Sequence, residues 1–338
     1  MINILVTGAG GGVGQGIIKS LKMIKDLDIN IIGADMSSKA AFLYACDKAI
    51  LLPACMDKTY KTALEKIFKD EAIDYYFPGT DIELKFCSLN KKEFYESFKV
   101  KTVISDINLI TISDDKLKTA NFLNENGLDF PATFKITDFS DQLSFPVIIK
   151  PRVGFRSIGV FKAHDHELIN KFRKEDYIVQ ELVGTEEDEY TCTIVKSNNK
   201  LSVPIILRRV LRSGDTFQAQ PVESPKIAEY ILSIASKIDI DGGCNFQLRL
   251  DKNGNPKLFE INARFSGTTP FCSLLGFNPL EYYLKNQMSL NYNYSIDMDS
   301  LILRHWSELK IKNQNLSEID KKKKLSSFAI KQISFFDD

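Results

Sequence analysis

The sequence predicts an α/β protein whose C-terminal part follows an α+β pattern. Over residues 2–104, short apolar runs alternate with helical segments, which is typical of a parallel, doubly wound sheet. Later in the chain, runs of alternating apolar and polar residues flank a dense turn signal, which is typical of a hairpin. The length of 338 residues allows two or three domains with a substantial core.

The composition is ordinary for a soluble globular protein, with 44% hydrophobic and 26% charged residues. Lysine plus arginine and aspartate plus glutamate both number 44, so the net charge gives no electrostatic reason to expect nucleic acid or an anionic membrane as a partner. The six cysteines are scattered without a CxxC pair, which predicts reduced thiols and a cytoplasmic location. Neither a signal peptide nor an apolar run of membrane-spanning length is indicated.

The N-terminal segment begins with a predicted buried strand at residues 2–6, and a glycine-rich turn at 7–14 leads into a helix that reaches Leu21. Glycines let the backbone approach a partner closely, and they leave amide N–H groups at the helix N-terminus. A second strand at 29–34 ends in Asp35, where a dinucleotide-binding fold would place its ribose-binding acid.

The glycines do not match the dinucleotide fingerprint G-x-G-x-x-G. Counted from Gly8 its last position is Val13, and counted from Gly10 it is Gln15. We therefore favour tight packing of helix on strand as the role of these glycines, with a bound dinucleotide as the alternative. An NAD(P)-dependent reductase or epimerase would also want a tyrosine–lysine pair, and the clear Y-x-x-x-K at 95–99 comes early, in a charged helix.

A strand at 73–77 is followed by the loop Pro78–Leu84, which lies at the carboxyl end of the strand, the usual place for ligand contacts in an open α/β sheet. Asp81 in this loop is either such a contact or the N-cap of the next helix. Strand 102–104 closes the first predicted domain.

Two lysines in the next part of the chain are candidates for binding an anion. Ser113 is the predicted cap of a helix whose first turn contains Lys116, where a cation opposes the helix dipole. The opposition hints at a ligand, although a solvated lysine is the commoner explanation. A buried strand delivers Lys150, and the turn at 152–160 carries glycines and free amides. This arrangement suits a triphosphate, but it is not the Walker pattern, because the lysine precedes the loop.

The most informative stretch is a predicted hairpin around the turn 251–256. If the first and last residues of that turn close the hairpin, Gln247 lies opposite Glu260 and Asn245 lies opposite Asn262, with side chains roughly 5 Å apart. A face with one carboxylate and several amide oxygens can bind Mg²⁺, while the plainer interpretation is a solvated polar face.

Arg264 follows on the same side as Glu260 and Asn262. An arginine beside two metal-ligand candidates indicates an anion held next to a cation, and phosphate is the obvious candidate.

Taken together, these segments resemble the ATP-grasp superfamily, in particular the branch built like half of a carbamoyl phosphate synthase large subunit. The resemblance covers roughly residues 1–290, and the motifs that carry it are ILVTGAGGGVG, FPGTDIEL, DDKLKTANFLNENGLDFP, IIKPRVGFRSIGV, VQELVG, EYT, RSGDT, NFQLRL and FEINARFSG. It implies a Rossmann-like pre-ATP-grasp domain at 1–107, a small ATP-grasp lobe at 108–178, a large lobe with the Mg·ATP site at 179–290 and a C-terminal extension at 291–338.

The resemblance also implies roles for individual residues. Lys116 and Lys150 would bind the ATP phosphates, under a flexible loop that contains Ser157. The segment with Gln180, Glu181 and Val183 would bind adenine, and Glu189 would bind the ribose. The metal would be held by Gln247, Glu260 and Asn262, of which Gln247 would also face ATP. The implied catalytic residues are Arg264 and Arg212. Mn²⁺ could substitute for Mg²⁺.

Three positions depart from the pattern of the family. Arg156 stands where a third loop glycine is common, Cys192 where an acid often follows the ribose glutamate, and Arg212 where the synthetase has a histidine. Arg212 therefore argues against carbamoyl phosphate synthesis itself, and the chain of 338 residues is also too short for the duplicated synthetase.

The expected function is that of an ATP- and Mg²⁺-dependent carboxylate–amine or carboxylate–thiol ligase that forms an acyl phosphate. Its expected partners are a small-molecule carboxylate and an amine, with no nucleic acid and no membrane, and the resemblance allows a homodimer. The alternatives are the NAD(P)-dependent reductase or epimerase and a nucleotide-binding regulator without turnover.

Overall fold

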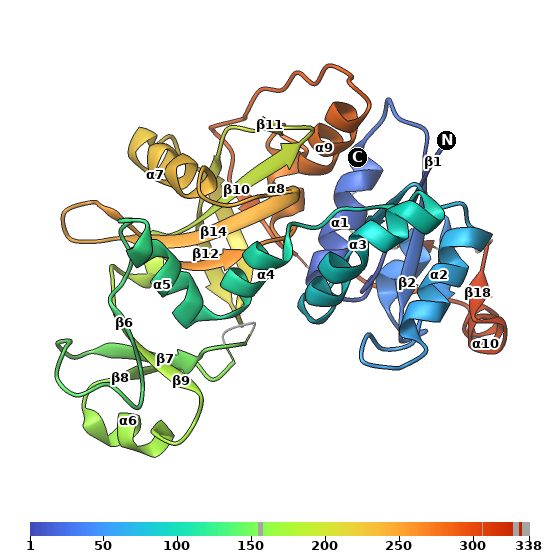
Figure 1. Cartoon of the computed structure of the whole chain (residues 1–338). Coiled ribbons are helices and arrows are strands. Elements are labelled where there is room, and N and C mark those ends of the chain that lie inside the picture. Colours follow the sequence, from blue (N-terminus) through green and yellow to red (C-terminus); the bar gives the residue numbers. More distant parts are fainter. Residues whose placement is uncertain (155–157, 306, 327–330, 333–338) are drawn as a thin grey trace.

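In a computed structural model of the chain, three main sheets and their helices form neighbouring bodies (Figure 1). The structure describes residues 1–154, 158–305, 307–326 and 331–332. A six-stranded, mostly parallel sheet contains the N-terminal strands, and a four-stranded and a seven-stranded antiparallel sheet follow. The predicted α/β class with an α+β C-terminal part is therefore confirmed. The domain limits at 107, 178 and 290 stay a prediction.

The N-terminal sheet has the strand order β18-β3-β2-β1-β4-β5, and all its strands except β18 are parallel. The parallel strands are β1 (Ile2–Val6), β2 (Ile29–Asp35), β3 (Lys48–Leu51), β4 (Tyr75–Phe77) and β5 (Lys101–Thr102), and the connections contain α1 (Gly12–Met23), the 3-10 helices η1 (Ala41–Ala45) and η2 (Asp81–Glu83), α2 (Tyr60–Asp70) and α3 (Leu84–Phe98).

Alternate residues of β1 face two different cores, as the pleat of a strand buried on both sides requires. Leu5 packs in one cluster with α2 and α3. Ile4 and Val6 pack in the other cluster with α1 and with the later helices α8 (Thr269–Leu274) and α9 (Pro279–Gln287). The N-terminal sheet is therefore joined to the C-terminal half through a shared apolar core, not through a linker alone.

The C-terminal segment returns to the N-terminal sheet. Helix α10 (Asn313–Lys322) leads into β18 (Lys324–Leu325), which pairs antiparallel with β3. The buried Glu71 carboxylate accepts hydrogen bonds from Lys48 at 2.7 Å and from Lys324. Burial alone would raise the pKa of Glu71, but the hydrogen bonds from Lys324 and Lys48 outweigh burial and lower it. The β18–β3 pairing and the buried Glu71 carboxylate thus attach the C-terminal segment to the N-terminal sheet.

The four-stranded sheet has the order β6-β9-β7-β8. Its elements are β6 (Thr133–Lys135), β7 (Val147–Pro151), β8 (Phe161–Ala163), α6 (His166–Phe172) and β9 (Tyr177–Glu181). The sheet has a small core of its own, in which Val147, Ile149, Ile169 and Val179 are buried. Because this core is small, we expect contacts with the neighbouring sheets to contribute to the stability of the four-stranded sheet.

Two helices connect the N-terminal sheet to the four-stranded sheet, α4 (Ile107–Asp114) and α5 (Lys116–Glu125). The predicted cap, Ser113, lies inside α4, so this prediction was wrong. Asp115 caps α5 instead, and its carboxylate accepts the backbone N–H of Leu117 at 3.0 Å. The negative cap offsets the presence of Lys116 in the first turn, because an anion at a helix N-terminus is stabilised by the helix dipole.

The seven-stranded sheet follows the path β15-β14-β10-β12-β13-β16, with β11 beside β10. Its elements are η3 (Glu186–Asp188), β10 (Glu189–Ser197), β11 (Lys200–Leu201), β12 (Ile205–Arg212), β13 (Asp215–Pro221), α7 (Pro225–Ala235), β14 (Gly242–Leu250), β15 (Pro256–Asn262) and β16 (Ile302–Leu303), and β17 (Leu309–Lys310) pairs separately with β19 (Lys331–Gln332). Helix α7 buries Ile227, Ile231 and Ile234, the amphipathic face that helical spacing predicts.

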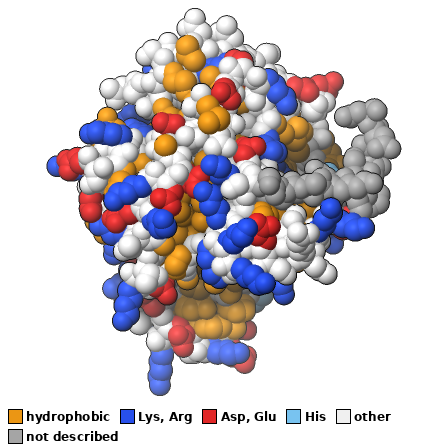
Figure 2. All heavy atoms as spheres, turned by 90° about the vertical axis from the view of Figure 1, so that its right-hand side faces the viewer, with side chains coloured by type: hydrophobic (Ala, Val, Ile, Leu, Met, Phe, Trp, Pro, Cys, Tyr) orange, Lys and Arg blue, Asp and Glu red, His pale blue; other side chains and the backbone are white. Residues whose placement is uncertain are grey.

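Charged side chains of both signs are interspersed on the face shown in Figure 2, where they do not gather into a patch of one sign. This distribution agrees with the balanced composition. Among the described helices, none is long and apolar enough to cross a membrane. All six cysteines are free thiols, and five of them are buried.

Candidate active site

A cavity of about 1300 Å³ lies where loops of the three main sheets meet. Its walls include the start of α1, the loop after β4, the segment between β7 and β8, the end of β9 and the β14–β15 hairpin. Pockets for one small ligand span about 300 to 1,000 Å³, so this cavity has room for a nucleotide and a second substrate. The predicted site residues that line it are Lys116, Lys150, Gln180, Glu181, Val183, Glu189, Gln247, Glu260, Asn262 and Arg264.

The β14–β15 hairpin has the predicted pairing at the cavity and a different pairing at its turn. Gln247 lies opposite Glu260 and Asn245 opposite Asn262, as the sequence predicts. The turn closes one residue earlier than predicted, because Leu250 and not Asp251 pairs with Pro256. A bulge restores the predicted register.

The extra residue of this bulge is Phe259, which is skipped between the pairs Leu248–Leu258 and Gln247–Glu260. A bulge changes which side chains of a strand face the core. Before it, Leu258 is buried, and after it Ile261 is buried while Glu260 faces the cavity. The bulge is therefore what allows one strand to serve both the core and the candidate site.

Lys150, at the end of β7, is a cation in the cavity wall with only 6% of its surface exposed. Burial lowers the pKa of Lys150 to about 8; Lys116 and Arg249 act in the same direction, and Glu260 and Glu189 oppose them. Its ammonium lies 5.3 Å from the ring centre of Phe259, and in the described part of the chain it takes part in no ion pair. A buried, unpaired cation of this kind favours an anionic ligand.

Lys116 lies across the segment between β7 and β8. Its ammonium donates to the carbonyl of Gly154 at 3.1 Å, and its backbone N–H donates to the carbonyl of Arg152 at 3.0 Å. The Arg152 guanidinium in turn pairs with Asp115 at 2.5 Å. These contacts hold Lys116 against the segment that follows Lys150, and both lysines line the cavity. Arg156 and Ser157 lie outside the described residues.

The end of β9 provides the wall that was predicted to contact adenine. Gln180 is buried and donates from its amide to the Thr133 hydroxyl at 2.8 Å. Glu181 is exposed and accepts the backbone N–H of Ala132 at 3.1 Å. Val183 is buried beside them. All three side chains line the cavity, so this end of β9 offers an apolar group beside two polar ones.

Glu189 is held by two arginines that sequence reasoning did not single out as site residues. Its buried carboxylate pairs with Arg209 at 2.6 Å and with Arg249 at 2.9 Å. Arg209 also donates to the side-chain oxygen of Gln247 at 2.8 Å. Arg249 lies two residues after Gln247, on the same polar face of β14, and this spacing could have identified Arg249 as a site residue.

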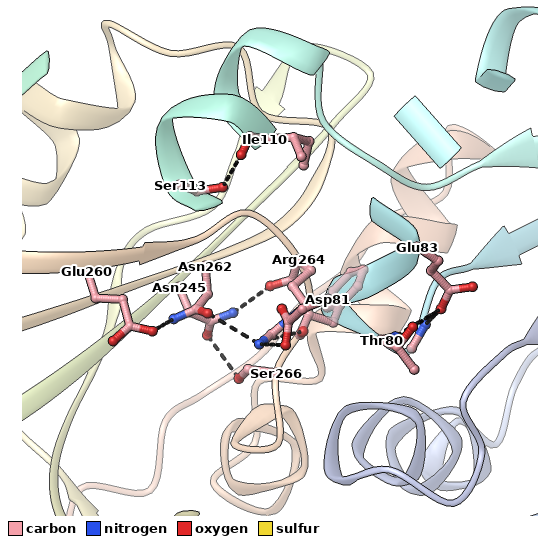
Figure 3. A network of polar contacts seen from close by, with 12 residues as sticks. Thr80, Asp81, Glu83, Ile110, Ser113, Asn245, Glu260, Asn262, Arg264 and Ser266 are labelled. Atoms are coloured by element: carbon pink, nitrogen blue, oxygen red, sulfur yellow. Dashed lines mark hydrogen bonds and ion pairs between the residues drawn. The ribbon is translucent and has the colours of Figure 1, made fainter. Parts of the chain in front are cut away.

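A chain of polar contacts runs along the cavity lining from β15 to the loop after β4 (Figure 3). The Asn262 amide donates to Glu260 at 3.1 Å, and its oxygen accepts from Arg264 at 3.2 Å. Arg264 forms a two-pronged ion pair with Asp81, at 2.5 and 3.0 Å. The structure thereby joins the predicted metal face to an acid of the N-terminal part.

The loop that carries Asp81 is fixed by Glu83, whose importance the sequence did not reveal. Its buried carboxylate accepts hydrogen bonds from the hydroxyls of Thr7 at 2.8 Å, Tyr60 at 2.7 Å and Tyr76 at 2.8 Å. It also accepts the backbone N–H of Thr80 at 2.9 Å and completes a capping box with that residue. Thr80, not Asp81, is the N-cap, so the side chain of Asp81 is left to face the cavity.

The glycine-rich turn before α1 packs against protein. Both carboxylate oxygens of Asp35 accept backbone N–H groups, from Gly10 at 2.9 Å and from Ser37 at 3.0 Å. A Cβ added at Gly14 would lie 2.2 Å from the carbonyl oxygen of Gly8, and one at Gly16 would lie 2.7 Å from that of Ser266. This geometry favours close packing over a bound dinucleotide.

Arg212 is the described site candidate that lies outside the cavity lining. It is exposed at the end of β12, with its guanidinium carbon 5.2 Å from the ring centre of Phe217. Its catalytic role stays a prediction.

The oxygen ligands on the β14–β15 face fit a metal that is shared with a polyphosphate. Within the described residues, no group of three or more His, Cys, Asp or Glu side chains could hold a metal by itself. The cavity instead offers the Glu260 carboxylate with the amide oxygens of Asn262 and Gln247 beside it. Mg²⁺ is commonly bound by one or two carboxylates together with phosphate oxygens.

Two family models match the chain. Residues 4–103 match "PylC-like, N-terminal domain", and residues 173–303 match "ATP-grasp in the biosynthetic pathway with Ter operon". The chain is 24% identical over 311 residues to the carbamoyl phosphate synthase large chain of Clostridium botulinum and 21% identical over 315 residues to the arginine-specific mitochondrial large chain of Neurospora crassa. Both alignments cover 82% of this chain but only 28% and 26% of those relatives.

Solved structures share the fold at low sequence identity. N5-carboxyaminoimidazole synthetase from Staphylococcus aureus, complexed with ADP, has a TM-score of 0.69 at 15% identity, over 95% of this chain and 85% of that one. L-amino acid ligase from Bacillus licheniformis has a TM-score of 0.65 at 18% identity, over 85% and 74%. The chain therefore combines a PylC-like N-terminal domain at residues 4–103 with an ATP-grasp domain at residues 173–303.

Proposed function

We propose that the chain is an ATP- and Mg²⁺-dependent ligase that joins a carboxylate to an amine, or to a thiol, through an acyl phosphate. The observation that carries the proposal is the meeting of two lysines and an oxygen-rich face in one cavity. Lys116 and Lys150 line this cavity, and so do Glu260, Asn262 and Arg264. The relatives named for carbamoyl phosphate synthesis and amino acid ligation support a reaction of this class.

The two lysines would bind and orient the phosphates of ATP, and the end of β9 would receive the adenine. An oxygen of the substrate carboxylate would attack the γ-phosphorus as the bond to the β-phosphate oxygen breaks, so that ADP leaves and an acyl phosphate remains. Arg264 would stabilise the charge on the transferred group. The amine would then attack the acyl carbon, and inorganic phosphate would leave as the amine loses its proton. Alignment and charge neutralisation would be the protein's main contributions.

Gln247, Glu260 and Asn262 are the residues that would hold Mg²⁺ or, in its place, Mn²⁺. When bound, the metal would neutralise phosphate charge and fix the phosphates in position.

Replacing Glu260 with Gln tests the metal assignment, because the change removes the one carboxylate of this face and keeps its shape. We expect Mg·ATP-dependent ADP release, screened over amino acids, sugar acids and small peptides as acceptors, to fall at least about a hundredfold, as loss of a transition-state charge contact does. Glu229→Gln, on the exposed surface of α7, is the matched control and should keep full activity.

Full ADP release by the Glu260→Gln variant would contradict the metal assignment. Saturable Mg·ATP binding without ADP release for any acceptor pair in the screen would instead indicate a nucleotide-binding regulator.

A further inference from the structure

Arg264 and Asp81 join two parts of the chain in the cavity lining (Figure 3). Arg264 follows β15 of the seven-stranded sheet, and Asp81 begins η2 beside the N-terminal sheet. The Nε of Arg264 donates to one carboxylate oxygen of Asp81 at 2.5 Å, and its Nη2 donates to the other at 3.0 Å. The arginine that would face the transferred phosphoryl group is therefore paired with an acid.

The hydrogen bonds of Arg264 leave little capacity for a further ligand. A guanidinium has five N–H hydrogens. Two are donated to Asp81, a third goes from Nη2 to the Asn262 oxygen at 3.2 Å, and a fourth goes from Nη1 to the Phe265 carbonyl at 3.2 Å. One N–H remains, on Nη1.

A phosphoryl group is bound most strongly by an arginine through two parallel N–H donors. The edge formed by Nε and Nη2 is occupied by Asp81, and the other edge has a single free hydrogen. For Arg264 to grip a phosphoryl group through the two donors of its Nε–Nη2 edge, it must release Asp81. On this edge the ion pair and the phosphate contact therefore exclude one another.

Asp81 cannot follow the arginine, because its loop is held by the buried Glu83 and by the capping box with Thr80. Its side chain is 38% exposed and lines the cavity, whereas that of Arg264 is 12% exposed. Release of Arg264 would leave a fixed carboxylate facing the substrate space, and a cation with N–H donors is the partner that would neutralise it.

We propose that Asp81 binds the amino group of the acceptor in its cationic form, before that group loses a proton to solvent and attacks as the neutral amine, and that this contact releases Arg264 to the acyl phosphate. Asp81 is then an acceptor-binding residue and a latch that links arrival of the amine to stabilisation of the phosphoryl group. This inference rests on the proposed ligase function and adds to it the charge of the acceptor and the order of events. Binding of the two ligands is cooperative, because each removes the contact that opposes the other.

The test measures this cooperativity in the full-length protein saturated with Mg·ADP. The anionic probe is acetonylphosphonate, an acyl-phosphate mimic in which a methylene replaces the bridging oxygen. The cationic probe is ammonium chloride, compared at equal ionic strength with tetramethylammonium chloride, which has no N–H to donate. For the wild type we expect ammonium to lower the Kd of acetonylphosphonate about fivefold or more.

In Asp81→Asn the latch is weakened, so acetonylphosphonate should bind more tightly than to the wild type and ammonium should have no further effect. Asp114→Asn is the control, because Asp114 is an exposed acid of the same cavity that makes no described contact with Arg264. It should show the wild-type response to ammonium.

Equal Kd values in the two salts for the wild type, or weaker acetonylphosphonate binding in Asp81→Asn, would overturn the proposal. The salt comparison needs no variant, so it decides the matter even if Asp81→Asn does not fold. Absence of Mg·ADP binding in the same titrations would instead count against the proposed function, and Mg·ADP binding without ammonium coupling would count against the latch alone.

Discussion

At the residue scale, the candidate site is defined by charged side chains that are buried from solvent. Lys150 is almost completely buried, and burial lowers its pKa to about 8. Glu189 is buried with its two oxygens on different arginines, so its charge is already compensated. Lys150 is therefore available to bind an anionic ligand, whereas Glu189 stabilises the cavity wall through its two ion pairs.

The lowered pKa of Lys150 predicts that ATP binding takes up a proton. In the free protein about half of the Lys150 side chains are neutral at pH 8, and a bound polyphosphate would favour the charged form and raise the pKa. Uptake should be near zero below pH 7, where the side chain is charged in both states, and should rise to about half a proton at pH 8.

Calorimetric titration of ATP in buffers with different ionisation enthalpies measures this uptake. Lys150→Met keeps much of the apolar stem and should abolish the uptake as well as weaken binding. A wild-type protein that binds ATP at pH 8 without proton uptake would show that Lys150 does not face the phosphates.

At the scale of the elements, the alternation of residues predicted the contents of the β14–β15 face but not how its register arises. Gln247, Glu260 and Asn262 were placed by simple pairing across the turn, and the structure confirms that pairing. The bulge at Phe259 was not predictable, because two compensating one-residue shifts leave the same pairs opposite each other. Arg209 was missed because only the fold brings β12 beside β10 and sets it against Glu189.

The glycines of α1 predict a difference between two similar substitutions. Gly16→Ala would place a Cβ 2.7 Å from the Ser266 carbonyl oxygen, and we expect a loss of about 1 to 3 kcal/mol of stability from overpacking. Gly12→Ala would meet its nearest atom, an oxygen of Asp215, at 3.9 Å and should change stability by less than about 0.5 kcal/mol. Thermal unfolding of both variants measures the difference, and a larger loss in Gly12→Ala would refute the packing role of Gly16.

At the scale of the whole molecule, the site depends on parts of the chain that lie far apart in sequence. Asp81 lies in the loop after β4 of the N-terminal sheet, and Lys150 lies in β7 of the four-stranded sheet. Glu260 lies in β15 of the seven-stranded sheet, and Arg264 follows that strand. The order of the motifs along the sequence predicted that these residues share one site, because all the motifs resemble the same family. They could not predict the Asp81–Arg264 contact or the return of β18 to β3, since both depend on tertiary packing between distant segments.

The most direct test of the central claim is a titration of the wild-type protein with Mg·ATP and, separately, with NADH. The account predicts saturable binding of ATP that weakens when EDTA removes the metal, and no saturable binding of NADH. Saturable NADH binding together with no binding of Mg·ATP would contradict the account and favour a dinucleotide at the N-terminal sheet.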